Sequence, residues 1–296
     1  MSPRRVAVAT SRALPELDDD GPRLLAALAG AGLAAQVTVW DSPDVDWSGF
    51  DVVLVRSIWD YTLRRPEFLA WAASHPRTAN PAPVLAWNTD KRYLDDLAAA
   101  GVPVVPTVFA RPGEPLELPS GWADGDVVAK PTVSAGAADT GRFPARSGGA
   151  QALVDRLHRA GRTAMLQPYL PRVEADGETA LVFLGGQFSH AVRKAALLAG
   201  PGERPPVPED HALDVISPAT ATREQLAVAQ AALAAVPGGP AALSYARVDL
   251  IPDQLGRPTV LELELTEPSL FLKHASQPSM HRFATHVGVM AGQPSP

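Results

Sequence analysis

Three carboxylates and one guanidinium near the end of the chain form the sharpest chemical pattern in the sequence. The last two apolar runs read as paired strands, and strand side chains alternate between two faces. In a hairpin symmetric about the 252–258 loop, Asp249 lies opposite Glu262. Arg247 then lies opposite Glu264 on the same face of the pair. The other face takes Leu261, Leu263 and Leu265.

Carboxylates that face each other repel, and a sheet tolerates them when they are solvated or when a cation compensates their charge. Mg²⁺ prefers oxygen ligands and commonly takes one or two carboxylates together with phosphate oxygens. Asp249, Glu262 and Glu264 therefore form a candidate Mg²⁺ platform, with Mn²⁺ as the alternative ion. The competing explanation is the solvated polar face of an ordinary strand pair.

Lysines and small residues upstream could bind phosphate. Lys130 ends an apolar run and is followed by the loop 132–140, where Ser134 and Gly136 would let backbone N–H groups approach an anion. Lys91, at the start of an expected helix, could also reach a phosphate. No Gly-Lys-Ser/Thr sequence accompanies them, so this is not the P-loop pattern. A solvent-facing lysine and an ordinary loop would explain each feature separately.

The elements that must position these groups begin with an alternation of strand and helix. Runs at 5–10, 36–40 and 51–56 read as strands, with a helix between the first two, and this predicts an open α/β sheet. The segment RSIWDY at 56–61 follows the third strand, where functional residues of such sheets lie. A packed tryptophan and a surface turn would explain that segment equally well. Glu267, near the other end, could line a substrate pocket or form part of a turn.

Composition narrows the function classes. The formal net charge of −6 and the pI near 5.6 disfavour a general nucleic-acid binder. With no cysteine, the chain has no disulfide, thiolate metal site or cysteine nucleophile. No uncharged apolar run is long enough for a membrane helix, and no signal peptide is evident. We therefore expect a cytoplasmic protein without a membrane partner.

The order of these features resembles the ATP-grasp superfamily, which includes D-alanine:D-alanine ligase and glutathione synthetase. A helix-start lysine, a strand-end lysine, a small-residue loop, a hinge, Arg-x-Asp and Glu-x-Glu follow one another over residues 88–271. The resemblance implies an α/β (α+β) ATP-grasp fold with a Rossmann-like N-terminal open sheet. Its parts would be an N-terminal domain at 1–86, a central lid subdomain at 87–166 and a C-terminal subdomain with the metal site at 167–296.

The resemblance also implies roles for individual residues. The ATP-binding residues would be Lys91, Lys130, Ser134 and Gly136 at the phosphates, Gln167, Tyr169 and Leu170 at adenine, and Glu178 at the ribose. The metal ligands would be Asp249, Glu262 and Glu264, and the catalytic residues would be Arg193 and Arg247. Related ligases have Asn where this chain has Glu264, so the extra negative charge puts the number of metal ions in doubt.

A finer resemblance rests on the strings RSIWDY, WNTDKRYL, GETALVFLGGQFSHAVRK and LELELTEPSLFL. They look like a bacterial ATP-grasp group that includes the cycloserine-forming cyclo-ligase of antibiotic biosynthesis. This implies an ADP-forming carbon–nitrogen ligase that uses ATP and Mg²⁺ to activate a carboxylate as an acyl phosphate, which a nitrogen then attacks.

In that group the substrate is the small amino acid O-ureido-D-serine, which closes to D-cycloserine. The alternatives are an intermolecular amino-acid or peptide ligase, a small-molecule kinase, and a non-catalytic nucleotide-binding regulator. A homo-oligomer is compatible with the sequence.

Overall fold

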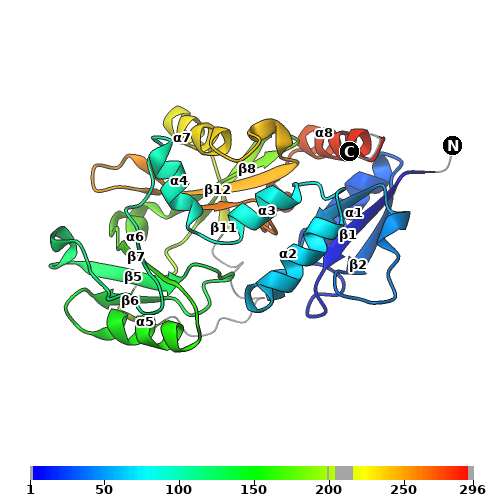
Figure 1. Ribbon diagram of the computed structural model, residues 1–296. Coiled ribbons are helices and arrows are strands. Elements are labelled where there is room, and N and C mark those ends of the chain that lie inside the picture. The colour runs from blue at the N-terminus through cyan, green and yellow to red at the C-terminus, as the bar shows by residue number, and fades with distance from the viewer. Residues whose placement is uncertain (1–2, 199, 204–215, 293–296) are drawn as a thin grey trace.

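The computed structural model describes residues 3–198, 200–203 and 216–292, which form three sheets with helices packed against them (Figure 1). The first sheet is parallel, in the order β2-β1-β3. Its elements are β1 (Arg5–Thr10), α1 (Gly21–Gly30), β2 (Ala34–Val39) and β3 (Val52–Val55). Helix α1 has a proline in its first turn, and Gly32 follows it with a φ of +75°. The expected N-terminal open α/β sheet is confirmed.

Three helices connect this sheet to the rest of the chain. They are α2 (Arg65–Ser74), α3 (Ala82–Asn88) and α4 (Tyr93–Ala99). Asn80 precedes α3 and is fully buried, where its side-chain amide donates to the carbonyls of Tyr245 and Leu265. These hydrogen bonds tie the segment to the C-terminal part of the chain.

The central sheet is antiparallel in the order β10-β6-β5-β7-β4, and α5 packs on it. Its elements are β4 (Val108–Ala110), β5 (Asp126–Pro131), β6 (Gly141–Pro144), α5 (Gly149–Arg159), β7 (Ala164–Pro168) and β10 (Gly202–Glu203). Alternate residues of β5 are buried, so its apolar side chains cover α5 while Lys130 lies on the other face.

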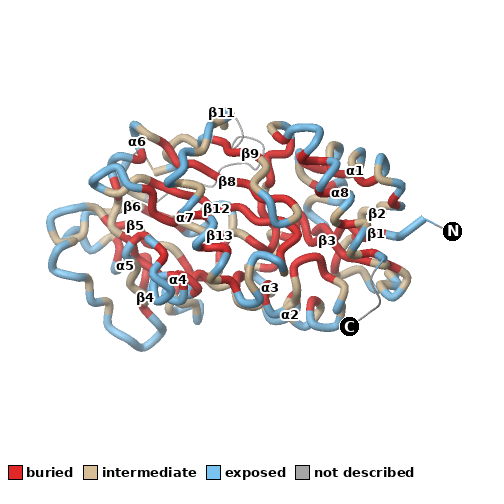
Figure 2. Tube along the Cα trace, turned by 90° about the horizontal axis from the view of Figure 1, so that it is seen from above, coloured by how far each residue is buried: buried red, intermediate tan, exposed pale blue. Residues whose placement is uncertain are grey.

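The C-terminal sheet is also antiparallel, in the order β11-β9-β8-β12-β13. Its elements are α6 (Arg172–Asp176), β8 (Glu178–Leu184), β9 (Gln187–Lys194), β11 (Ile216–Ala219), α7 (Arg223–Ala234), β12 (Tyr245–Pro252), β13 (Pro258–Glu264) and α8 (Gln277–Gly292). Strands β8 and β12 are buried along almost their whole length (Figure 2). A capping box at Thr222 and Gln225 begins α7.

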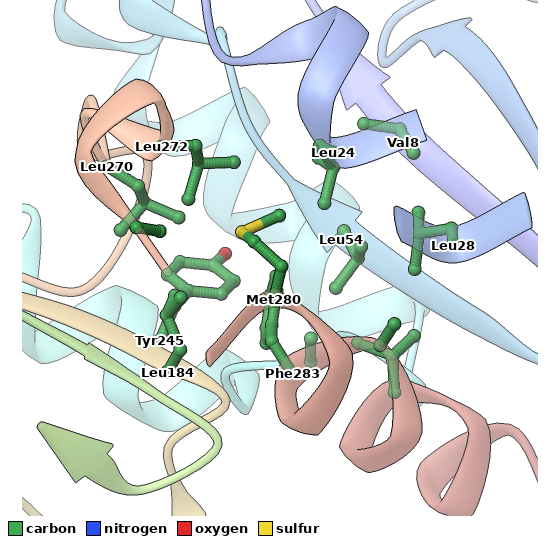
Figure 3. Packing of buried hydrophobic residues seen from close by; sticks show 14 of the residues in the cluster. Val8, Leu24, Leu28, Leu54, Leu184, Tyr245, Leu270, Leu272, Met280 and Phe283 are labelled. Atoms are coloured by element: carbon green, nitrogen blue, oxygen red, sulfur yellow. The ribbon is translucent and has the colours of Figure 1, made fainter. Parts of the chain in front are cut away.

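One apolar core joins the first and last parts of the chain. Leu24, Leu28 and Leu54 of the N-terminal unit pack with Met280 and Phe283 of α8 (Figure 3). Helix α8 lies beside α1 in Figure 1, so the two ends of the chain form one packed unit. The expected three-part division stays a prediction; the positions 86/87 and 166/167 fall inside α3 and β7.

Within the part of the chain that the structure describes, no helix combines the length and apolarity that a membrane crossing needs.

Candidate active site

The β12–β13 hairpin places the expected charges opposite one another. Asp249 pairs with Glu262, and Arg247 pairs with Glu264. The expected pairing is therefore confirmed. It arises through a β-bulge, because the register shifts after Asp249 and β13 carries one extra residue there.

The extra residue is Leu261, and the bulge turns it away from the face expected for it. Leu261 packs with Val105, Leu170 and Ile251, whereas Leu263 belongs to a different core cluster. The prediction that Leu261 and Leu263 share one apolar face is wrong, since a bulge breaks strict alternation.

Arg247 links the two strands at the centre of the charged cluster. Its guanidinium donates to both oxygens of Asp249 at 2.9 and 3.0 Å, to Glu264, and to the carbonyl of Ser269 at 2.9 Å. Burial opposes ionisation of Asp249, but Arg247 and Lys194 hold the pKa of that carboxyl down at about 2. Asp249 is therefore charged at neutral pH.

Lys194, which the sequence analysis did not single out, completes the pairing of Asp249. Its ammonium group lies 2.7 Å from Asp249 and 2.8 Å from Glu178. Arg193 is exposed on the opposite face of β9 and donates to the carbonyl of Asp176 at 2.6 Å. The structure does not bring Arg193 to the cluster, and Lys194 occupies the place expected for it.

A second β-bulge explains why Lys194, and not Arg193, faces the charged cluster. The register of β8 and β9 shifts between Val182 and Phe183, so Glu178 pairs with Lys194 instead of Arg193. Lysine in place of arginine keeps the positive charge but loses the planar fork that binds two oxygens.

Lys91 and Lys130 come from the central part of the chain and face the same carboxylates. Lys91 is buried and lies 3.0 Å from Glu262, and it also donates to the carbonyl of Ser134 at 2.7 Å. Burial lowers the pKa of Lys130, Glu262 opposes this effect and Lys91 adds to it. The two lysines expected at the phosphates therefore meet the carboxylates expected at the metal.

The small-residue loop 132–140 follows Lys130 and contacts Lys91. Ser134 is buried and accepts from Lys91, while Gly136, Ala137 and Asp139 adopt left-handed backbone conformations. Arg162 holds the loop through Asp139 at 2.6 Å. Such a turn with small side chains leaves room for an anion close to the backbone.

A small apolar cluster lies beside the charges, at the expected adenine hinge. Leu170 packs with Val105, Val173 and Ile251, and Tyr169 packs against them. The ring of Tyr169 also lies 3.5 Å from the guanidinium carbon of Arg142. The Gln167 side chain is buried and donates to Thr107 at 3.0 Å, so it holds the hinge.

The segment after β13 is fixed by side chains from both ends of the chain. Its consecutive carbonyls accept hydrogen bonds from five donors: Tyr245 to Thr266, Trp59 to Glu267, Arg56 to Pro268, Arg247 to Ser269, and His190 to Leu270. Asp20 accepts the backbone N–H groups of Leu270 and Leu272 at 2.6 Å each. The RSIWDY segment thus builds the wall of the site, a role that sequence reasoning left open.

The donor set fits a divalent cation, although it is not closed around one. No three His, Cys, Asp or Glu side chains in the described ranges are close enough to hold a metal ion without rearrangement. Burial raises the pKa of Glu264 to about 7 even though Arg247 opposes it, and Glu262 adds to the rise. A raised pKa means that burial opposes the ionised form of Glu264, and a hard cation between these oxygens would stabilise that form.

This fold and this set of charges define an ATP-grasp ligase. Among solved structures, D-alanine–D-alanine ligase from Bacillus anthracis matches with a TM-score of 0.62 at 14% identity, over 97% of each chain. The crystal structure of D-cycloserine synthetase DcsG matches with a TM-score of 0.84 at 36% identity, over 97% of this chain and 99% of that one.

Sequence comparison narrows the class. The family described as "D-cycloserine synthetase DcsG, N-terminal domain" matches residues 6–82. Cycloserine biosynthesis protein DcsG from Streptomyces lavendulae is 39% identical over 292 residues, which cover 94% of this chain and 96% of that protein. The chain belongs to the DcsG family of ATP-grasp ligases.

Proposed function

We propose that this enzyme uses ATP and Mg²⁺ to activate the carboxylate of a small amino acid as an acyl phosphate, which a nitrogen of the same molecule then attacks. The substrate we favour is O-ureido-D-serine. Its N–O nitrogen would attack the acyl phosphate and expel phosphate, and hydrolysis of the ureido group would release its carbamoyl part as carbon dioxide and ammonia, which gives the D-cycloserine of antibiotic biosynthesis. The observation that carries the proposal is the near-full-length 39% identity to a cycloserine biosynthesis protein. The meeting of Lys91 with Glu262 supports it from the structure.

The central sheet would hold the triphosphate. Lys91, which is buried, and Lys130, which is half-buried, are cations on one side of the cluster, and Ser134 and Gly136 follow in the small-residue loop. Anionic phosphate oxygens would replace Glu262 as the partner of Lys91. The apolar cluster around Leu170 would take the adenine, and Glu178 would accept from the ribose hydroxyls.

The C-terminal sheet would hold the metal and the reacting groups. Asp249, Glu262 and Glu264 would bind Mg²⁺, or Mn²⁺ in its place, and the ion would supply positive charge to the phosphate oxygens. Arg247 and Lys194 lie on the same face and would stabilise the negative charge that develops on phosphoryl transfer. Removing one such group typically lowers kcat by a factor of about 10²–10³.

Ring closure would require the site to hold the substrate's nitrogen next to its activated carboxyl carbon. The carboxylate is a poor electrophile until phosphate replaces oxide as its leaving group. When the nucleophilic nitrogen belongs to the same molecule, a site that fixes the substrate's conformation replaces a bimolecular encounter. The segment 266–270 is held by five side-chain hydrogen bonds and provides such a rigid wall.

The test is product analysis with purified enzyme, ATP, Mg²⁺ and O-ureido-D-serine. We expect ADP and phosphate together with D-cycloserine by mass spectrometry, and a hydroxamate when hydroxylamine traps the acyl phosphate. ADP with an open-chain phosphorylated product would indicate a kinase, and product that requires a second amino acid would indicate intermolecular ligation. Release of AMP and pyrophosphate would contradict the proposal. A cytoplasmic location and a homo-oligomer stay predictions.

A further inference from the structure

Glu267 lies where the N-terminal unit meets the charged cluster. It follows β13, its side chain is directed into the protein so that the residue is only 9% exposed, and its carbonyl accepts from the Trp59 indole at 3.3 Å. Burial raises the pKa of the Glu267 carboxyl, the charge of Glu264 adds to the rise and Lys91 opposes it, so the group lies within electrostatic reach of both. The carboxyl group therefore faces the interior between these elements.

Glu267 differs from the other acidic residues of the cluster in having no cation partner. Each of the others forms an ion pair: Glu178 with Lys194, Asp249 with Arg247 and Lys194, Glu262 with Lys91, and Glu264 with Arg247. Among the residues that the structure describes, no Lys, Arg or His nitrogen lies within 4.0 Å of the Glu267 carboxylate. Burial of a carboxylate without a cation is costly and raises the pKa of Glu267, and a positively charged guest would stabilise its ionised form.

The backbone that carries Glu267 is fixed in advance. The carbonyls of Thr266, Glu267 and Pro268 accept from Tyr245, Trp59 and Arg56, at 3.1, 3.3 and 2.8 Å respectively. A side chain on such a fixed backbone needs little reorganisation when a ligand arrives.

The position of Arg247 indicates which positively charged group could lie next to the Glu267 carboxylate. Its guanidinium contacts Glu264 and the carbonyl of Ser269, two residues after Glu267. A substrate carboxylate activated beside Arg247 therefore has its α-carbon substituents next to the segment 266–270. In an amino acid one of these substituents is an ammonium group.

We propose that the Glu267 carboxylate binds the ammonium group of the amino-acid substrate and so selects compounds that carry an α-amino group. This assignment rests on the proposed function, because it needs a substrate whose carboxylate is activated at this site. It makes Glu267 a specificity-determining residue that acts through the substrate's charge.

The test compares O-ureido-D-serine with 3-(ureidooxy)propanoic acid, which has hydrogen in place of the amino group. In the wild-type enzyme, kcat/KM for ADP release should fall about 100-fold when the amine is removed, which is the size of effect seen when one member of a buried charge pair is lost. In Glu267→Gln the two compounds should differ by less than about threefold, and the loss for the natural compound should appear mainly in KM. Glu267→Asp, which keeps the charge, should restore part of the discrimination.

The matched control is Glu16→Gln, a surface change in the N-terminal unit that should keep the wild-type discrimination. Thermal unfolding of each variant checks its fold. Equal use of both compounds by the wild-type enzyme would overturn the assignment without any variant, as would undiminished discrimination in folded Glu267→Gln. A wild-type enzyme that makes no D-cycloserine from O-ureido-D-serine would instead overturn the proposed function on which the assignment rests.

Discussion

Lys194 donates a 2.7 Å hydrogen bond to Asp249, while Arg193, the residue before it, points out of the opposite face of the sheet. Lys194 therefore faces the charged cluster and Arg193 does not. We predict that Lys194→Ala lowers kcat by about 10²-fold or more, because a buried positive charge near the transferring phosphate is lost. Arg193→Ala should stay within about threefold of wild type. Steady-state assays of ADP release on both variants check this, and the reverse order of losses would return the role to Arg193.

Arg247 and Glu262 should both be essential for turnover. We predict that Arg247→Ala and Glu262→Ala each lower kcat by about 10²–10³, since one removes charge stabilisation and the other a metal ligand. The control is Leu255→Ala at the tip of the same hairpin, where the side chain is 75% exposed and contributes no charge. Circular dichroism and thermal unfolding show that a variant is folded. Wild-type turnover in either folded variant would remove that residue from the site.

The stability of the unliganded protein should fall as pH rises, because of Glu267. Burial raises the pKa of this carboxyl to about 8; Glu264 and Glu262 add to the rise and Lys91 opposes it. Between about pH 4.5 and 8 the folded state then holds a proton that the unfolded state has released, so the free energy of unfolding decreases over this range. The loss is on the order of 3–5 kcal/mol. In Glu267→Gln, which does not titrate, this part of the pH dependence should disappear.

Denaturant unfolding at pH 5 and pH 9 measures both proteins. Glu264, whose pKa burial raises to about 7, contributes to the slope of stability against pH in both proteins, so the slope should become shallower in Glu267→Gln without vanishing. An unchanged slope would show that Glu267 does not titrate in this range.

The buried pair of Asp20 and Arg56 should be important for stability. Asp20 accepts two backbone N–H groups at 2.6 Å and lies 3.4 Å from the Arg56 guanidinium. We predict that Asp20→Asn lowers the free energy of unfolding by about 3–5 kcal/mol, because it leaves a buried arginine without its counter-charge. Asp19→Asn, one residue earlier and exposed, should change it by less than about 0.5 kcal/mol. Equal unfolding midpoints for the two variants would contradict this prediction.

The β12–β13 charges could be predicted from the sequence because strand alternation holds on each strand between the bulge and the charged pairs. Arg247, Asp249, Glu262 and Glu264 follow that rule, and one face collects them. The two bulges were not predictable in this way. Nothing in the local sequence shows that β8 and β9 slip by one residue near Phe183, and this slip decides whether Glu178 pairs with Lys194 or Arg193.

The contacts that fix the segment 266–270 could not be predicted from the local sequence either. The segment RSIWDY suggested polar contacts, but the partners of Arg56 and Trp59 lie in the segment 266–270, more than two hundred positions along the chain. Burial of Lys91 was missed for the same reason, since its partner Glu262 comes from a distant strand. Only the tertiary arrangement brings these residues together.

The core shared by α1, β3 and α8 has a consequence for how the molecule is made. Leu24, Leu28 and Leu54 emerge from the ribosome more than two hundred residues before Met280 and Phe283, which cover them (Figure 3). The β2-β1-β3 sheet must therefore remain incompletely covered until α8 has been synthesised. A nascent chain arrested before Gln277 should expose those leucines to chaperones and to hydrophobic dyes, and a chain that includes α8 should not.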